Sequence, residues 1–337
     1  MQNPFTIGIV EGSDFCNRVK EIEELKNYAL NQENVVLYSP RRYGKSSLIM
    51  KLLKELEREN FLTVYIDLFP ISSKEDFIYR FAIGVFKGIG KGVYKRTFLE
   101  NLSRFFRSIV PVIEYKADSV SFSVKFNKEE KFETLLDDLL KGIYRYLKEK
   151  NFKACIVLDE FQEVTELKES KLIEGTIRSY AQFHKNLNFF YIGSRRRLLL
   201  DMFTDKNRPF YKSSFLYPLK EIPKDDFTLY IAEKFKKSKK NCERDLAEII
   251  YDMVRGYPYY VQKFSSLVWN LTLKTCDLDI IKKAFELLIK MESVDFEGIW
   301  NGLKLTQKVL LKAIAFNPTS SPFKKDYLEK YKLSLGG

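Results

Sequence analysis

Short apolar stretches alternate with amphipathic stretches over the first 220 residues, and this alternation restricts the fold more than any other feature. Strands that alternate with helices of ordinary length require a parallel sheet covered by helices on both faces. The apolar stretches, rich in β-branched and aromatic residues, predict strands over 34–38, 61–68, 154–158, 187–193 and 215–219. The amphipathic stretches predict helices over 18–30, 45–58, 74–89 and 129–150. We therefore predict an α/β fold.

The loop 39–46, Ser-Pro-Arg-Arg-Tyr-Gly-Lys-Ser, joins the first predicted strand to a long predicted helix. A phosphate chain binds where backbone amides point into one concavity at a helix N-terminus. In such a loop Gly44 permits the close backbone approach, Lys45 reaches the β- and γ-phosphates and Ser46 ligates Mg²⁺. The usual pattern begins with glycine where this chain has Ser39, so the strand and helix on either side carry much of the prediction. The residues expected around a nucleotide are Ser39, Pro40, Arg41, Arg42, Tyr43, Gly44, Lys45, Ser46 and Ser47.

Two carboxylates, Asp159 and Glu160, follow directly on the apolar strand 154–158. An apolar strand that ends in two acids is typical of the second half of a magnesium–nucleotide site. Asp159 would hold the metal, and Glu160 would polarise the water that attacks the γ-phosphate. The alternative is an ordinary acid pair that faces solvent at a strand end, and the phosphate loop upstream favours the metal site.

The next predicted strand ends at Gly193-Ser194, where ATPases of this kind place a polar residue between the attacking water and the γ-phosphate. We therefore expect Ser194 to act in catalysis, the alternative being a plain turn serine. Three arginines, 195–197, follow at a helix start, where surface positions are commoner than phosphate contacts.

Composition and charge limit the class of protein. The formal net charge of +12 suggests an acidic partner such as DNA, although lysines dispersed among glutamates also make an ordinary charged surface. No apolar run approaches the roughly 18 residues of a membrane span, and the N-terminus has no signal-peptide pattern. Four well-separated cysteines without a CxxC pair look like reduced thiols: Cys16, Cys155, Cys242 and Cys276. We expect a cytoplasmic protein without membrane contact.

Several segments resemble the archaeal and bacterial ATPases of AAA+ type, a family placed near the STAND NTPases and the origin-recognition ATPases. The core motifs that carry this resemblance are 39–49, 158–163, 191–196 and 208–211. Segment 15–22 is similar to the family's Phe-x-x-Arg-x-x-Glu stretch near the adenine, which places Arg18 at the nucleotide. Segment 256–262 resembles the Gly-x-Pro segment of the family's helical lid, which places Pro258 there.

The resemblance implies a P-loop NTPase core of the AAA+/ASCE class with ATP and Mg²⁺ as cofactors. The expected parts are a core over 1–220 with an insertion at about 88–130, a helical lid over 221–293 and a partial winged helix over 294–337. Arg208 stands where AAA+ proteins often carry an arginine finger that acts in trans. Equally, Arg208 would serve to anchor the turn at Pro209.

Three functions compete at this point. The first is an ATP-hydrolysing switch of the AAA+/STAND type, which binds ATP and ADP and reports to a protein partner or a second copy. The second is a DNA-handling ATPase of the replication-initiation or transposition type that uses a basic winged-helix tail. The third, a P-loop kinase, is disfavoured because a kinase needs no water-activating glutamate such as Glu160.

Overall fold

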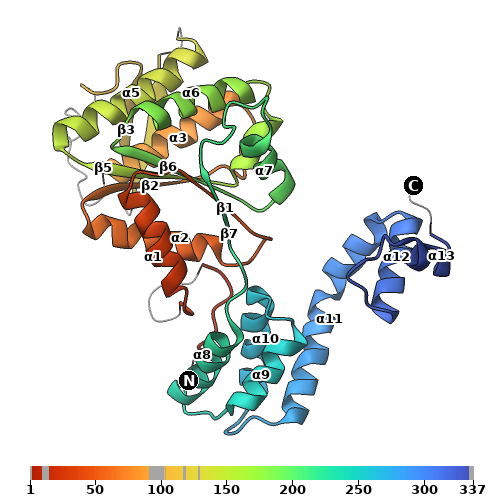
Figure 1. Ribbon diagram of the computed structural model, residues 1–337. Coiled ribbons are helices and arrows are strands. Elements are labelled where there is room, and N and C mark those ends of the chain that lie inside the picture. Colours follow the sequence, from red (N-terminus) through yellow and green to blue (C-terminus); the bar gives the residue numbers. More distant parts are fainter. Residues whose placement is uncertain are drawn as a thin grey trace.

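A parallel sheet of five strands forms the centre of the molecule, in the order β2-β5-β6-β1-β7 (Figure 1). Every neighbouring pair in this sheet runs parallel, which confirms the predicted α/β class. The computed structural model describes residues 2–9, 15–90, 102, 104–116, 119–127 and 130–333. The strands are β1 (Val35–Tyr38), β2 (Phe61–Asp67), β5 (Lys153–Asp159), β6 (Leu187–Gly193) and β7 (Phe215–Pro218).

Helices cover both faces of this sheet because the inner strands carry apolar side chains on both of their sides. Along β1, Val36 packs into one core while Val35 and Leu37 pack into the other, and all three are fully buried. The core of Val35 and Leu37 lies under α1 (Val19–Leu30) and α2 (Lys45–Arg58). The opposite face is covered by α3 (Lys74–Ile89), α5 (Phe132–Lys150), α6 (Ser170–Phe183) and α7 (Arg196–Thr204).

An antiparallel hairpin interrupts the alternation of strands and helices between α3 and α5. Its strands are β3 (Ile109–Lys116) and β4 (Ser119–Phe126), paired from Ile109 with Phe126 to Lys116 with Ser119. The hairpin lies within the insertion expected at about 88–130, and the alternating sequence 119–126 is typical of such a strand. The hairpin lies beside α3 and α5, away from the ends of β1 and β5 that carry the predicted site residues.

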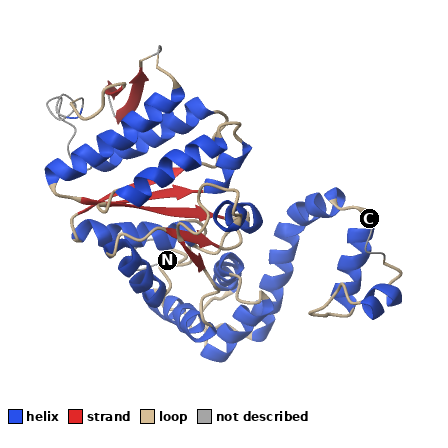
Figure 2. Cartoon of the chain, turned by 45° about the horizontal axis from the view of Figure 1, so that its top comes forward, coloured by secondary structure: helices blue, strands red, loops and turns tan. Residues whose placement is uncertain are grey.

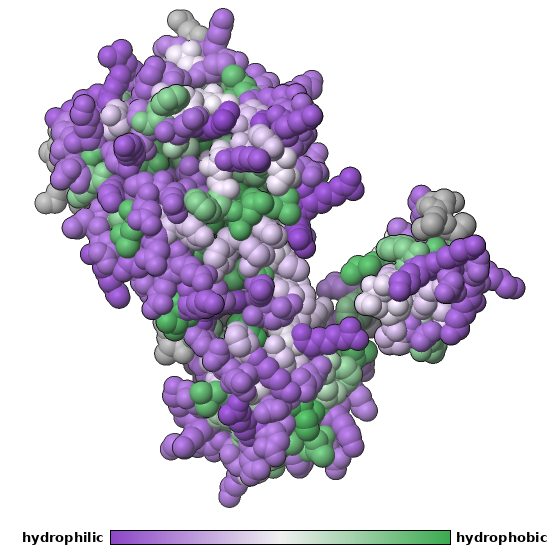
Figure 3. Space-filling model, viewed as in Figure 1, coloured by the Kyte–Doolittle hydropathy of each residue, from purple (hydrophilic) through white to green (hydrophobic). Residues whose placement is uncertain are grey.

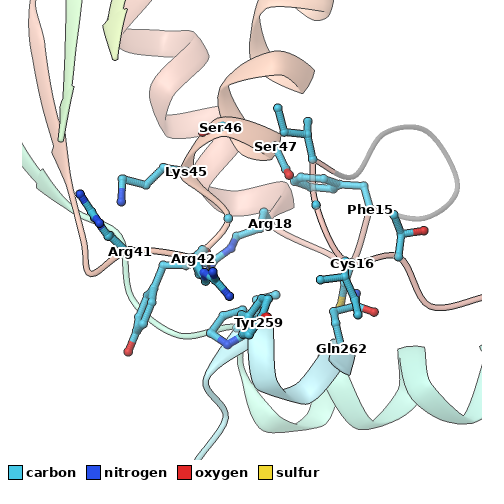
Figure 4. Close-up of a pocket in the computed structure, with 18 of the residues that line it drawn as sticks. Phe15, Cys16, Arg18, Arg41, Arg42, Lys45, Ser46, Ser47, Tyr259 and Gln262 are labelled. Carbon is cyan, nitrogen blue, oxygen red and sulfur yellow. Dashed lines mark hydrogen bonds between the residues drawn. The ribbon is translucent and has the colours of Figure 1, made fainter. Parts of the chain in front are cut away.

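A separate helical core follows the sheet. It is formed by α8 (Lys224–Lys237), α9 (Arg244–Met253), α10 (Pro258–Leu271) and the first half of α11 (Leu278–Gly302). Phe5 from the N-terminal segment packs into this core against Phe235, with ring centroids 5.6 Å apart. We call these helices the lid, because the first turn of α10 lies against the loop that follows β1 (Figure 4).

The long helix α11 carries the last two helices, α12 (Leu305–Phe316) and α13 (Lys325–Lys330), away from the lid (Figure 2). It runs without a break across residues 293 and 294, where the sequence analysis places a domain boundary. Among the described residues after 302 no strand is assigned, so the winged helix stays a prediction. Apolar side chains remain in solvent along the second half of α11 and on α12 (Figure 3), among them Val294, Leu305 and Phe316.

Candidate functional site

The loop between β1 and α2 turns through Gly44, which precedes the first residue of the helix. Gly44 has φ +86°, a conformation that side-chain-bearing residues rarely adopt, and open space lies where a Cβ would be. The first N–H groups of an α-helix have no partner within the helix and carry the positive end of its dipole. The start of α2 is therefore built to face an anion.

Lys45 lies against this loop with only 6% of its surface exposed. Its Nζ donates hydrogen bonds of 3.0 Å to the carbonyl oxygens of Ser39 and Pro40. Burial lowers the pKa of Lys45, and the carboxylates of Glu160 and Asp159 oppose that effect. The lysine thus sits between the loop and the two acids, as an ion that binds phosphate must.

The two predicted metal ligands meet in the structure. Ser46 Oγ, at the start of α2, donates a hydrogen bond of 3.2 Å to Asp159 Oδ2, at the end of β5. Burial raises the pKa of Asp159, and a hydrogen bond from the Tyr65 hydroxyl opposes the rise. A hydroxyl and a carboxylate are the hard oxygen ligands that Mg²⁺ prefers. The pair fits that ion.

Tyr65 is a site residue that the sequence analysis missed. It lies on β2, two residues before the strand end, and donates its hydroxyl to the same Asp159 oxygen that Ser46 contacts. In the β2–β5 ladder Tyr65 pairs with Val157, so its long side chain reaches the end of the neighbouring strand. The only signal in the sequence was the hydroxyl group of a tyrosine within a largely apolar strand.

Hydrogen bonds from neighbouring residues hold the carboxylate of Glu160 in place. Its Oε2 accepts hydrogen bonds from Ser194 Oγ at 2.8 Å, from Ser194 N at 3.2 Å and from Gln162 Nε2. The predicted catalytic residues Glu160 and Ser194 therefore come together from β5 and β6. Gln162, another missed residue, also restricts Gly193, because a Cβ there would lie 2.0 Å from Gln162 Oε1.

A cavity of about 700 Å³ opens in front of these groups (Figure 4). Its phosphate end contains the loop residues 41–47 together with Asp159 and Glu160. Its other end is more apolar and is formed by side chains from the N-terminal segment, the core–lid connection and the lid. That end is lined by Ile7, Ile9, Phe15, Cys16, Ile222, Phe227, Pro258, Tyr259 and Gln262.

Arg18 lies in the cavity wall and contacts the phosphate loop, while its expected place beside the nucleotide stays a prediction. Its guanidinium donates to the carbonyl oxygens of Lys220 at 2.7 Å and Tyr43 at 3.3 Å, and it pairs with Glu21. Arg18 is 4% exposed and has φ +128°, which is strained for a residue with a side chain. The surrounding hydrogen bonds hold this conformation.

Aromatic side chains of the lid contact the phosphate loop directly. The Tyr257 hydroxyl donates to the Arg41 carbonyl oxygen, and its ring meets the ring of Tyr43 edge to face at 4.9 Å. The Arg42 guanidinium lies 4.1 Å from the ring centroid of Tyr259. The loop and the first turn of α10 are therefore mechanically joined, which the sequence alone did not reveal.

Arg208 lies apart from this cavity and does not line it. Its guanidinium pairs with Glu174 on α6, a carboxylate with no exposed surface. Burial raises the pKa of Glu174 to about 7, although the charge of Arg208 opposes the rise. This geometry is the one expected of an anchor for the turn at Pro209, while a role of Arg208 in trans stays a prediction.

Comparisons with known proteins agree with this geometry. The family model described as an ATPase domain predominantly from Archaea matches residues 15–264. An uncharacterised ATP-binding protein of Methanocaldococcus jannaschii is 26% identical over 176 residues, which are 48% of this chain and 46% of that protein. The chain thus aligns with about half the length of this curated relative.

Two solved structures share the fold at low sequence identity. A Walker-type ATPase of Pyrococcus abyssi superposes with a TM-score of 0.64 at 16% identity, over 95% of this chain and 88% of that one. The ORC1 protein of Aeropyrum pernix, solved in complex with DNA, gives 0.51 at 12% identity, over 97% and 78%. In the part of the chain that the structure describes, no helix has the length and apolar character needed to cross a membrane.

Proposed function

This chain belongs to the family of ATPase domains found predominantly in Archaea, and we propose that it is a magnesium-dependent, ATP-hydrolysing molecular switch of the AAA+/STAND type. One observation carries the proposal. A single cavity gathers the loop around Gly44, the acids 159–160 and the first turn of α10. These are the three parts that a nucleotide-driven change of the lid would need.

In this proposal the triphosphate lies on the amides at the start of α2, with Lys45 Nζ against the β- and γ-phosphates. Ser46 Oγ and Asp159 would hold Mg²⁺, which when bound neutralises charge on the phosphate oxygens. The adenine would occupy the apolar end of the cavity, between Phe15 and Pro258. Arg18 keeps the loop in position through the Tyr43 carbonyl oxygen.

Glu160 is the proposed general base. Its carboxylate accepts hydrogen bonds from Gln162 and Ser194. To accept a proton from the attacking water, one carboxylate oxygen of Glu160 must face the cavity. Gln162 and Ser194 would orient the carboxylate for this. We expect hydrolysis to be slow unless a partner or a second copy of the chain completes the site.

The lid supplies the switch. Tyr257 and Tyr259 contact the loop residues Arg41 and Arg42, so any movement of the loop on binding phosphate acts on α10. Since α11 follows α10 and continues to α12 and α13, the change reaches a distant surface of the chain (Figure 1). A protein partner or a second copy would read that change.

Hydrolysis of ATP labelled at the γ-phosphate tests this proposal. We expect labelled inorganic phosphate as the product and a loss of at least tenfold in rate for Lys45→Ala, because a phosphate-binding charge is removed. Lys54→Ala, an exposed lysine on the same helix, is the matched control and should keep the wild-type rate. Transfer of the label to another acceptor would instead indicate a kinase.

A DNA-handling ATPase is the second candidate, and one observation favours it. Residues 304–332 contain seven lysines against two acids, Asp326 and Glu329. The ORC1 protein, which shares the fold, was solved in complex with DNA. Binding to duplex DNA at increasing salt separates the two candidates, because phosphate contacts give a steep dependence on salt concentration. Absence of binding at physiological salt would favour the first.

A further inference from the structure

Two of the four cysteines meet in the lid although they lie 34 positions apart in the sequence. Cys242 is in the connection between α8 and α9, and Cys276 is in the connection between α10 and α11. A parallel β-bridge between Asn241 and Thr275 joins these two connections. Its hydrogen bonds run from Asn241 N to Lys274 O at 2.7 Å and from Cys276 N to Asn241 O at 2.8 Å.

This bridge fixes the direction of both cysteine side chains. Residues in register on parallel strands point to the same side, and Cys242 and Cys276 each lie one residue past the bridged pair. Both are buried in the lid core, with 2% and 3% of their surface exposed. Cys242 Sγ donates a weak hydrogen bond of 3.8 Å to the Glu243 carbonyl oxygen, and Cys276 Sγ donates one of 3.7 Å to the Asp277 carbonyl oxygen. Paired parallel strands run about 4.8 Å apart, within the Cα separation that a disulfide spans.

We propose that Cys242 and Cys276 are a dithiol that a peroxide oxidises to a disulfide, which ties the two connections together. The Cys276 thiolate attacks one oxygen of hydrogen peroxide, so that a sulfenic acid forms and the other oxygen leaves as water after protonation. The Cys242 sulfur then attacks the sulfenic sulfur, the S–S bond forms and a second water leaves. Both thiols are oxidised and one peroxide is reduced to two waters.

In the proposal, the order of these steps follows from the groups that surround the two thiols. The neighbouring Cys242 thiol lowers the pKa of Cys276, and Thr272 acts in the same direction, while burial opposes both. The same contact raises the pKa of Cys242, as does burial. By contrast, burial raises the pKa of Cys16 to about 12 and also raises that of Cys155. Among the four cysteines, all of which the structure describes, Cys276 is the one whose pKa is lowered, and the proposal therefore gives it the first attack.

The position of the bond separates its effect from that of nucleotide. Helix α10 begins at Pro258, in the cavity wall, and ends at Leu271, close to the cysteines. Its 14 residues span about 21 Å at 1.5 Å per residue. The disulfide should therefore stabilise the lid without changing nucleotide affinity, and it does not depend on the proposed function.

Mass spectrometry of the full chain tests the bond. The protein is treated with hydrogen peroxide or with dithiothreitol, denatured, and alkylated with iodoacetamide without further reduction. We expect two alkylated cysteines after peroxide and four after dithiothreitol, with a peptide that links Cys242 to Cys276. Cys242→Ser and Cys276→Ser should lose the link, and Cys155→Ala, which removes a lone buried thiol, should keep it.

Thermal unfolding supplies a second measurement. Closing a loop of this length should raise the melting temperature of the oxidised wild-type protein by roughly 5–10 °C over the reduced protein, and Cys242→Ser should show no such difference. Four alkylated cysteines after peroxide, a link between another pair, or equal melting temperatures would each overturn the proposal. The wild-type measurements need no variant to fold.

Discussion

The carboxylate of Glu160, the proposed general base, is held in place by hydrogen bonds. Glu160 adopts φ +51°, and one of its carboxylate oxygens accepts hydrogen bonds from Gln162 Nε2 and from both the amide and the hydroxyl of Ser194. Replacement by glutamine keeps the size but removes the charge and the ability to accept a proton. Glu160→Gln should therefore bind ATP with wild-type affinity and hydrolyse it at least a hundredfold more slowly. A rapid-quench assay beside a binding titration checks both, and normal turnover would remove the proposed base.

Tyr65 acts through another residue, as a positioning residue for Asp159. Its hydroxyl donates to Asp159 Oδ2, and a hydrogen bond to a ligand oxygen fixes the direction in which that oxygen faces a metal. Tyr65→Phe should raise the Mg²⁺ concentration needed for half-maximal ATP binding by about tenfold while ATP binding at saturating Mg²⁺ is kept. Tyr79→Phe, on α3, is the control. An unchanged Mg²⁺ dependence would contradict this role.

Glu174 gives a prediction on stability because its carboxyl is fully buried beside Arg208. Burial raises its pKa from an ordinary 4.5 to about 7. A raised pKa stabilises the folded state below pH 4.5, and this contribution is lost as the pH rises through 7. Glutamine does not titrate, so Glu174→Gln should gain up to about 3 kcal/mol relative to wild type between pH 5 and pH 8.5.

Urea unfolding at both pH values measures this difference. Glu329→Gln, which changes an exposed carboxylate on α13, should show no pH-dependent gain. A gain for Glu174→Gln that is equal at the two pH values would contradict a raised pKa of the buried carboxyl that lies between them.

At the scale of elements, the turn from α9 into α10 places the lid against the phosphate loop. Gly256 makes this turn with φ +65°, and a Cβ there would lie 2.3 Å from the Tyr251 ring. Gly256→Ala should therefore destabilise the lid by about 1–3 kcal/mol. Gly298, inside α11, has open space around it, so Gly298→Ala should be neutral or stabilising. Urea unfolding compares the pair, and equal effects would contradict the account of this turn.

The sequence predicted elements well where apolar periodicity was strong. The five sheet strands follow from apolar runs such as 187–193. Contacts between distant elements could not be predicted, because no local pattern specifies them: Tyr257 meets Arg41, 216 positions away. The length of α11 could not be predicted either, because nothing in the sequence near the expected domain boundary at 293 shows that one helix continues to Gly302.

The candidate site divides along the same line. Lys45, Ser46 and Asp159 were predicted because each belongs to a local motif, and the parallel sheet brings these motifs to one edge. Tyr65 and Gln162 were missed because their roles depend on which oxygen of an acid they reach. Arg208 was left between two roles, and its buried partner Glu174 was visible only in three dimensions.

At the scale of the whole molecule, a rigid sheet and a helical lid share one cavity, and α11 carries the last helices outward from the lid (Figure 1). In the proposed function, a nucleotide in this cavity would contact both parts at once. Exposed apolar side chains lie along the second half of α11 and on α12, beyond the lid core (Figure 3).

Isothermal titration of the wild-type chain with Mg²⁺ and a non-hydrolysable ATP analogue tests the central claim, that loop, acids and lid form one nucleotide site. We expect saturable heat with one analogue per chain, and a loss of at least tenfold in affinity for Lys45→Ala and, in the presence of Mg²⁺, for Asp159→Ala. Absence of saturable heat with the folded wild-type protein, or unchanged affinity in both variants, would contradict the claim.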